Sequence, residues 1–274
     1  MVKQILACLD GSSLAERILP LAQAIASAEC ATLTILRVVN DSAEVSRQED
    51  YVREPARRFG AQVKLVVSDN PTSAILEELE KDPTTVLAIT THGRTAWSEA
   101  LLGSVASQVI SGAKRPVILY CPLSKDADAP KKINTIVVAV DGSDFSETII
   151  PYAAEMAKAL PARLLLVQVL PLQSSIPPGP DQETLVLLES SYLQRKAATI
   201  KQAHSITADW EVLHGDPGDA ICRYLKDMPN TLLAMTTHAR GPVERVMLGS
   251  VTGYCVRHSG VPLLINRPAI RSSI

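Results

Sequence analysis

The sequence of 274 residues predicts an α/β protein with two tandem domains, each a doubly wound parallel sheet of five strands. Two observations lead to this prediction. Short apolar runs alternate with segments of helical periodicity along the chain, which is the pattern of βαβ units. The chain also repeats itself, because ILACLDGS at 5–12 returns as IVVAVDGS at 136–143 and LGSV at 102–105 returns at 248–251. We therefore expect two copies of one domain, each with the strand order 3-2-1-4-5.

The first copy opens with a nearly continuous apolar run over 4–9, as expected for a strand that is buried on both faces. A helix follows, with apolar residues at helical spacing from Leu14 to Ile25 and with Ser12 or Ser13 as its N-cap. The remaining elements alternate in the same way: strands over 32–39, 62–67, 85–90 and 116–121, and helices over 42–58, 71–79 and 104–112.

The second copy repeats this order with an insertion. Asp10 and Asp141 are 131 positions apart, whereas Gly103 and Gly249 are 146 apart, so 15 extra residues lie in 170–209. We expect strands over 135–140, 163–169, 209–213, 231–236 and 261–265, helices over 145–160, 219–227 and 250–258, a loop over 173–180 and a longer helix beginning near 185.

Composition indicates the domain boundaries. The segment after the fifth strand is filled by Pro, Ala, Lys and Asp, which is typical of a linker. We expect domain 1 over 1–123, a linker over 124–133, domain 2 over 134–268 and a tail over 269–274.

Charge and cysteine usage indicate the environment. The net charge of −2 with mixed signs argues against nucleic acid as a partner, and no apolar stretch reaches membrane-spanning length. The sequence runs from Met1 directly into a strand, so we expect no signal peptide. The five cysteines show no CxxC pair, and Cys8 and Cys121 lie in apolar runs. Buried free thiols, a reducing cytoplasm and no bound metal are therefore expected.

The candidate site lies where strands one and four end. In a sheet of order 3-2-1-4-5 these strands are neighbours at the switch point, beyond whose carboxyl ends ligands bind. Asp10 ends the first strand, and Gly103-Ser104 opens the helix that follows the fourth. A helix N-terminus presents unpaired N–H groups to an anion, glycine permits close approach of a phosphate, and serine adds a hydroxyl. Asp10 is the expected acceptor for ribose hydroxyls.

At this point the residues resemble the universal stress protein family. Its ATP-binding members carry Gly, two residues, Gly, nine residues, then Gly-Ser or Gly-Thr. The resemblance covers nearly the whole chain and also matches the aspartate at the end of the first strand and the apolar residue that closes the second strand. The corresponding positions are Asp10, Val39, Thr90, Gly93, Gly103 and Ser104 in the first copy, and Asp141, Val169, Thr236, Ala239, Gly249 and Ser250 in the second.

The resemblance implies an adenine-nucleotide alpha-hydrolase-like fold that binds ATP, with Mg²⁺ as a companion of the phosphates, in a regulatory stress-response protein that is not an enzyme. It also implies an intramolecular pseudo-dimer through the fifth strands and a homodimer of chains. Arg94 either pairs with phosphate or points to solvent.

Departures from the family pattern favour the first copy as the competent site. Thr90 and Thr236 replace the first glycine, which suits a strand but would strain a backbone of positive φ. Ala239 replaces the second glycine, where a methyl group would crowd a phosphate, and Pro242 stiffens the same loop.

Other interpretations stay open. Asp10 and Asp141 can be turn residues, and the Gly-Ser pairs can be plain helix starts. His92 and His238 have no partnered nucleophile and fit loop structure better than catalysis. A second hypothesis is a degenerate scaffold that mediates protein interaction without nucleotide. A third is a slow ATPase or phosphotransferase, which has the least support because the P-loop lysine and a carboxylate pair are missing.

Overall fold

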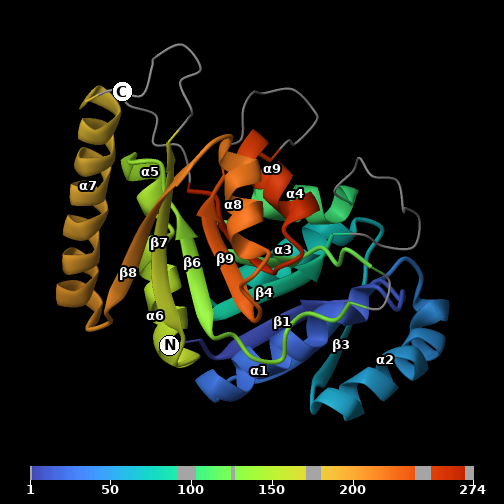
Figure 1. Ribbon diagram of the computed structural model, residues 1–274. Helices are drawn as coiled ribbons and strands as arrows, with labels where there is room; N and C mark the ends of the chain where they lie inside the picture. Colours follow the sequence, from blue (N-terminus) through green and yellow to red (C-terminus); the bar gives the residue numbers. More distant parts are fainter. Residues whose placement is uncertain (1, 92–102, 125–126, 171–179, 238–247, 269–274) are drawn as a thin grey trace, which may run out of the picture.

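The computed structural model describes residues 2–91, 103–124, 127–170, 180–237 and 248–268 (Figure 1). The expected tail over 269–274 lies outside the described residues. The predicted alternation of strands and helices is confirmed in both halves of the chain.

The first half contains elements that alternate as the sequence predicts. They are β1 (Gln4–Cys8), η1 (Ala15–Ile18), α1 (Leu19–Glu29), β2 (Thr32–Val39), η2 (Ser42–Glu44), α2 (Val45–Phe59), β3 (Gln62–Val67), α3 (Pro71–Glu80), β4 (Thr85–Thr90), α4 (Ser104–Gly112) and β5 (Val117–Tyr120).

The second half repeats this order with a much longer helix before its third strand. Its elements are β6 (Thr135–Ala139), α5 (Asp144–Glu147), α6 (Ile150–Ala159), β7 (Arg163–Leu170), α7 (Pro180–His204), β8 (Ala208–His214), α8 (Pro217–Leu225), β9 (Thr231–Thr236), α9 (Ser250–His258) and β10 (Leu263–Asn266). The 15 extra residues therefore lengthen the connection that holds α7.

The first helix of each half differs from the prediction, because it begins with a separate short turn. Pro20 and Pro151 have no N–H to donate to the carbonyl four residues earlier, so the regular ladder starts again around them. The expected single helix over 145–160 is therefore divided into α5 and α6. Neither Ser12 nor Ser13 is the N-cap, because the first turn begins at Ala15 with Leu14 as its N-cap residue, although the Ser12 Oγ accepts the Ala15 N–H at 3.1 Å.

The strands form one continuous sheet in the order β3-β2-β1-β4-β5-β10-β9-β6-β7-β8. The predicted order 3-2-1-4-5 is confirmed in each half, and all pairs within a half are parallel. The fifth strands pair antiparallel, with Leu119 opposite Leu263 and Val117 opposite Ile265. This pairing is the predicted intramolecular pseudo-dimer, and it joins the two sheets edge to edge.

Helices cover both faces of the sheet (Figure 1). One core packs β1 residues Ile5 and Ala7 against α1, α2, α6 and α7. The other packs Leu6 and Cys8 from the same strand against α3, α4, α8 and α9. Successive strand residues thus enter opposite cores, which is why the strands read as continuous apolar runs.

The linker is held against the first half. The Asp128 carboxylate accepts from Arg17 at 2.8 Å, and the Ala129 N–H donates to the Arg17 carbonyl at 2.9 Å. Across the junction, α1 lies against α6. The two halves are therefore joined through the sheet, the linker and one helix pair.

The five cysteines are free, and Cys8, Cys121 and Cys255 are buried. Burial raises the pKa of the Cys8 and Cys121 thiols, so both are held as neutral thiols. The predicted burial of these two thiols is confirmed. In the part of the chain that the structure describes, no helix combines the length and the apolar character needed to cross a bilayer.

Candidate functional site

Two Asp-Gly-Ser turns follow the first strands of the two halves. Asp10 Oδ1 accepts from the Ser12 N–H at 2.9 Å and the Ser12 hydroxyl at 2.6 Å. Asp141 Oδ1 accepts from Ser143 in the same way, at 3.0 and 2.5 Å. The intervening glycines have φ of +89° and +83°, which favours glycine over any other residue. Both aspartates therefore do shape a turn, and each does so through one carboxylate oxygen.

The hydrogen bonds to Asp141 also determine the direction in which its pKa is shifted. Partial burial raises the pKa of its carboxyl, but hydrogen bonds from Ser143 and Ser146 outweigh burial and hold the pKa below its ordinary value. Asp141 is consequently an anion at neutral pH.

Thr90 and Thr236 take the place of the first glycine in the family pattern. Both end strands, and neither has a positive φ. The Thr90 hydroxyl donates to the Ala15 carbonyl at 3.1 Å, and the Thr236 hydroxyl donates to the Ser146 carbonyl at 3.1 Å. Each threonine thus ties the fourth strand to the turn after the first strand, without backbone strain.

Glycines precede α4 and α9, and both helices begin without a side-chain cap. The Gly103 N–H donates to the Thr91 carbonyl at 2.7 Å, and the Gly249 N–H donates to the Thr237 hydroxyl at 3.0 Å. On the same face, α3 and α8 are capped by the side chains of Asn70 and Asp216. Among the described residues no side chain caps the first amides of α4 and α9, which leaves them for an anion or water.

A cavity of about 300 Å³ lies in the first half, at the carboxyl ends of β1 and β4. It brings together four of the residues that the sequence singles out: Asp10, Thr90, Gly103 and Ser104. Leu36, Ile75 and Ile89 are among the residues that give it apolar walls. One cavity is thus surrounded by the Asp10 acceptor, the first amides of α4 and an apolar wall.

Val39 does not line this cavity, whereas Val38 does. The sheet register pairs Gln4 with Thr32 in the first half and Thr135 with Arg163 in the second, which makes Val38 the equivalent of Val169. The equivalence of Val39 and Val169 is therefore wrong by one residue. A shift of one position in a strand turns the side chain to the opposite face.

Gly93, Arg94 and Ala239 lie outside the described residues, as do His92 and His238. Their expected contributions stay predictions.

Arg37 is a member of this crevice that the sequence did not reveal. It is only 9% exposed, lines the cavity, and directs its guanidinium to the Gln48 amide at 3.1 Å and the Leu9 carbonyl at 3.5 Å. Its counterpart Gln168 is also buried, but Gln168 Oε1 has no hydrogen-bond partner among the described residues. Alternation of apolar and polar residues near the end of a strand could have signalled Arg37.

A tyrosine–glutamate pair supports the turn in each half, and the sequence did not reveal this either. The Tyr51 hydroxyl on α2 donates to Glu16 Oε1 at 2.7 Å and contacts the Ser12 carbonyl at 3.4 Å. The Tyr192 hydroxyl on α7 donates to Glu147 Oε1 at 2.8 Å, and Lys196 binds the other oxygen of Glu147.

The charges around these hydroxyls identify them as hydrogen-bond donors. Burial, the hydrogen bond to Glu16 and the charges of Glu16 and Asp10 raise the pKa of Tyr51, while the guanidinium of Arg37 opposes this shift. Burial and the Glu147 carboxylate raise the pKa of Tyr192 in the same way. Both tyrosines therefore stay protonated and fix the helix before the third strand to the Asp-Gly-Ser turn.

The fold and this crevice define a tandem α/β protein with a doubly wound sheet and a hollow at the switch point of its first half. The family comparison agrees with that class. The model of the universal stress protein family matches residues 1–120 and again 132–267, so the chain belongs to the universal stress protein family in its tandem form.

Curated relatives carry the same family name. A universal stress protein of Synechocystis sp. is 22% identical over 308 residues, covering 97% of this chain and all of that protein. One from Mycobacterium tuberculosis is 29% identical over 150 residues. That alignment covers 47% of each chain, so this chain matches about half the length of that relative.

Solved structures share the fold. A universal stress protein from Archaeoglobus fulgidus superposes with a TM-score of 0.68 at 19% identity, covering 97% of this chain and 98% of that one. One from Pseudomonas aeruginosa gives 0.68 at 17% identity, covering 97% and 94%.

Proposed function

We propose that this stress-family chain is a regulatory module that binds ATP in the crevice of its first half. The observation that carries the proposal is the cavity of about 300 Å³ in which Asp10 faces the uncapped start of α4. A volume of this order suits a small ligand with a few fixed polar contacts.

Each lining group has a proposed role. The first amides of α4 and the Ser104 hydroxyl bind phosphate oxygens. The Asp10 oxygen that is not used in the turn accepts from the ribose, and Val38 packs on the adenine. Thr90 holds the strand end in place, Gly93 joins the phosphate contacts as the family pattern implies, and Arg94 pairs with a phosphate.

Mg²⁺ accompanies the phosphates in this proposal, bound mainly by phosphate oxygens and water. The described residues contain no group of three or more His, Cys, Asp or Glu side chains placed to bind a metal without a ligand's help.

The second crevice is the weaker nucleotide site in this proposal. It has the same kinds of groups in Asp141, Val169, Thr236, Gly249 and Ser250, but Asp141 is exposed and Ala239 replaces a glycine. We assign no catalytic residue, because the proposed contacts bind and orient a nucleotide and none supplies a base. ATP then acts by favouring one conformation or assembly of the chain over another.

The cytoplasm as location and a homodimer of chains belong to the same proposal. The outer strands β3 and β8 leave Val63, Val67 and Trp210 partly exposed, which offers edges for a second chain. Light scattering with and without ATP tests the assembly.

Isothermal titration of the full chain with MgATP tests the function. We expect saturable binding that is lost in the Gly103→Val/Ser104→Ala variant and kept in the matched Gly249→Val/Ser250→Ala variant. Absence of heat and of a thermal shift at millimolar ATP would favour the nucleotide-free scaffold. Release of phosphate by the wild type, absent from the first variant, would favour the slow ATPase.

A further inference from the structure

Helices α8 and α9 pack closely in the second half. A Cβ added at Gly218 on α8 would lie 2.9 Å from the Tyr254 ring on α9, so only glycine allows this approach. Cys222 follows Gly218 by one helical turn, and Cys255 follows Tyr254 directly. The close approach therefore brings two thiols from different helices together.

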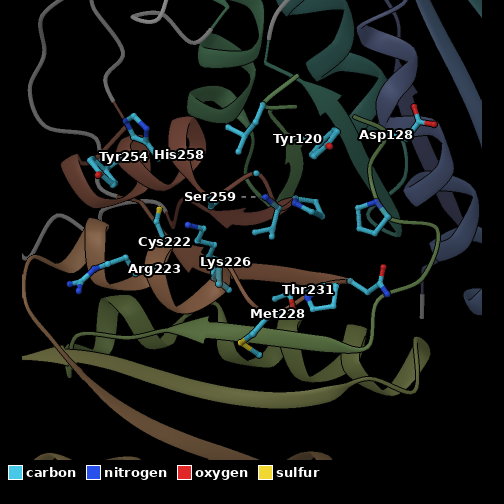
Figure 2. A pocket seen from close by; sticks show the side chains of 18 residues that line it. Tyr120, Asp128, Cys222, Arg223, Lys226, Met228, Thr231, Tyr254, His258 and Ser259 are labelled. Carbon is cyan, nitrogen blue, oxygen red and sulfur yellow. Dashed lines mark hydrogen bonds between the residues drawn. The ribbon is translucent and has the colours of Figure 1, made fainter. Parts of the chain in front are cut away.

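The two thiols are neighbours and have different surroundings. Their side chains lie within hydrogen-bonding reach of each other. Cys255 is fully buried in the core, whereas Cys222 is half-buried. Cys222 lines a second cavity, of about 710 Å³, together with Tyr254 and His258 (Figure 2). A small solute can therefore reach Cys222 before it reaches Cys255.

The first half shows that the fold does not require this pair. The residues equivalent to Cys222 and Cys255 are Leu76 on α3 and Val109 on α4. These helices pack in the same arrangement, since Thr72 and Gln108, the equivalents of Gly218 and Tyr254, form a hydrogen bond of 2.8 Å. An apolar pair serves the packing in one half, and a dithiol occupies the same place in the other.

The hydrogen bond makes the two thiols chemically unequal. It lowers the pKa of Cys222, against the opposing effects of burial and of the Asp219 carboxylate. The same bond and then burial raise the pKa of Cys255. Cys222 is therefore the more acidic thiol of the pair, and Cys255 is the one that retains its proton.

We propose that Cys222 and Cys255 are a modification site, a dithiol that hydroperoxides oxidise to a disulfide joining α8 and α9. The arrangement has the two parts of a redox-responsive site, an accessible cysteine that lines a cavity and an adjacent resolving thiol. The proposal does not depend on nucleotide binding.

The reaction balances with hydrogen peroxide as the oxidant. The Cys222 thiolate attacks one peroxide oxygen, the O–O bond breaks, and hydroxide leaves, which gives a sulfenic acid on Cys222. The Cys255 sulfur then attacks the Cys222 sulfur, its proton joins the departing hydroxyl, and water leaves. Two thiols and one peroxide thus yield one disulfide and two waters.

The test is to treat the full native chain with equimolar hydrogen peroxide, denature it, alkylate the free thiols and map the peptides by mass spectrometry. We expect a linked peptide that contains Cys222 and Cys255, with loss of two of the five alkylatable thiols and full recovery after dithiothreitol. Cys8 and Cys121 should stay alkylatable. Cys30, which is exposed, reports how much oxidation the treatment causes without a partner thiol.

Two variants that borrow the first-half residues keep the helix packing. In Cys255→Val, Cys222 should stop at the sulfenic acid and react with dimedone. In Cys222→Leu, Cys255 should remain a thiol. The proposal is overturned if the wild type gives no linked peptide while Cys30 is oxidised, or if Cys255 in Cys222→Leu is oxidised as readily as in the wild type.

Discussion

The two halves of this chain share a backbone plan but differ in the side chains behind each crevice. Both have the Asp-Gly-Ser turn, a strand-ending threonine, a glycine before an uncapped helix and a tyrosine–glutamate pair. The first half places the charged Arg37 behind the turn, where the second has Gln168, whose Oε1 finds no hydrogen-bond partner in the part of the chain that the structure describes. Duplication has thus kept the groups that set backbone geometry, while the groups that set charge have diverged.

The largest effect is expected when Arg37 and its counterpart Gln168 are each replaced by the same apolar residue, methionine. Arg37→Met should lower the free energy of unfolding by about 2 kcal/mol, because it leaves the Gln48 and Leu9 acceptors without their donor. Gln168→Met should instead raise it by about 1 kcal/mol, since it removes a buried acceptor that lacks a partner within the described ranges. Urea unfolding measures the free energy of unfolding of both variants. A change of the same sign in the two would contradict the expected difference between the halves.

Removing the threonine hydroxyls should have the next largest effect. Thr90→Val removes the buried hydrogen bond to the Ala15 carbonyl and should cost about 2 kcal/mol. Thr236→Val should cost about 1 kcal/mol, because Thr236 is less buried and water can replace its bond to Ser146. Thermal unfolding checks the order, with Thr90→Ser as a control that keeps the hydroxyl.

The proposed nucleotide role of Asp10 predicts a smaller difference between the two halves, in the ATP affinity of matched aspartate variants. Asp10→Asn keeps an oxygen for the Ser12 turn but removes the charged acceptor, so ATP affinity should fall about tenfold, or about 1.4 kcal/mol. Asp141→Asn should leave that affinity unchanged. Titration calorimetry measures both. An equal loss in the two variants would mean that both crevices bind ATP, and a loss in Asp141→Asn alone would mean that only the second does.

Acid should produce the smallest effect. Because hydrogen bonds hold the folded-state pKa of Asp141 below its ordinary value, its contribution to stability is complete above about pH 4 and is lost as the pH falls through the folded pKa. Asp141→Asn should therefore be less stable than the wild type at pH 7, by well under 1 kcal/mol since the group is exposed, and equal to it near pH 2. A stability difference between Asp141→Asn and the wild type that grows as the pH falls would contradict a lowered pKa for Asp141.

Sequence patterns predicted the fold because they are local and repeated. Apolar runs marked the strands, and the duplicated segments 5–12 and 136–143 marked the halves. The division of the helix over 145–160 was missed. Pro151 has no N–H to donate to the backbone hydrogen bonds of the helix, and the spacing of apolar residues does not reveal this interruption. Val39 was chosen in place of Val38 because two adjacent valines look equivalent until the register places one on each face.

The parts of the sites that sequence reasoning missed depend on contacts between distant elements. Tyr51 and Glu16 are 35 positions apart, whereas Tyr192 and Glu147 are 45 apart, so the insertion hides their equivalence. Cys222 and Cys255 have no motif spacing and meet only because α8 and α9 pack at Gly218.

The antiparallel pairing of β5 with β10 has one more consequence. Since all strands within a half are parallel, the strands of one half run opposite to those of the other across the whole sheet. The carboxyl ends of β1 and β4 therefore lie at one rim, and those of β6 and β9 lie at the other. Occupants of the two crevices would therefore lie at different rims of the sheet, and a partner that binds at one rim would contact the occupant of one crevice.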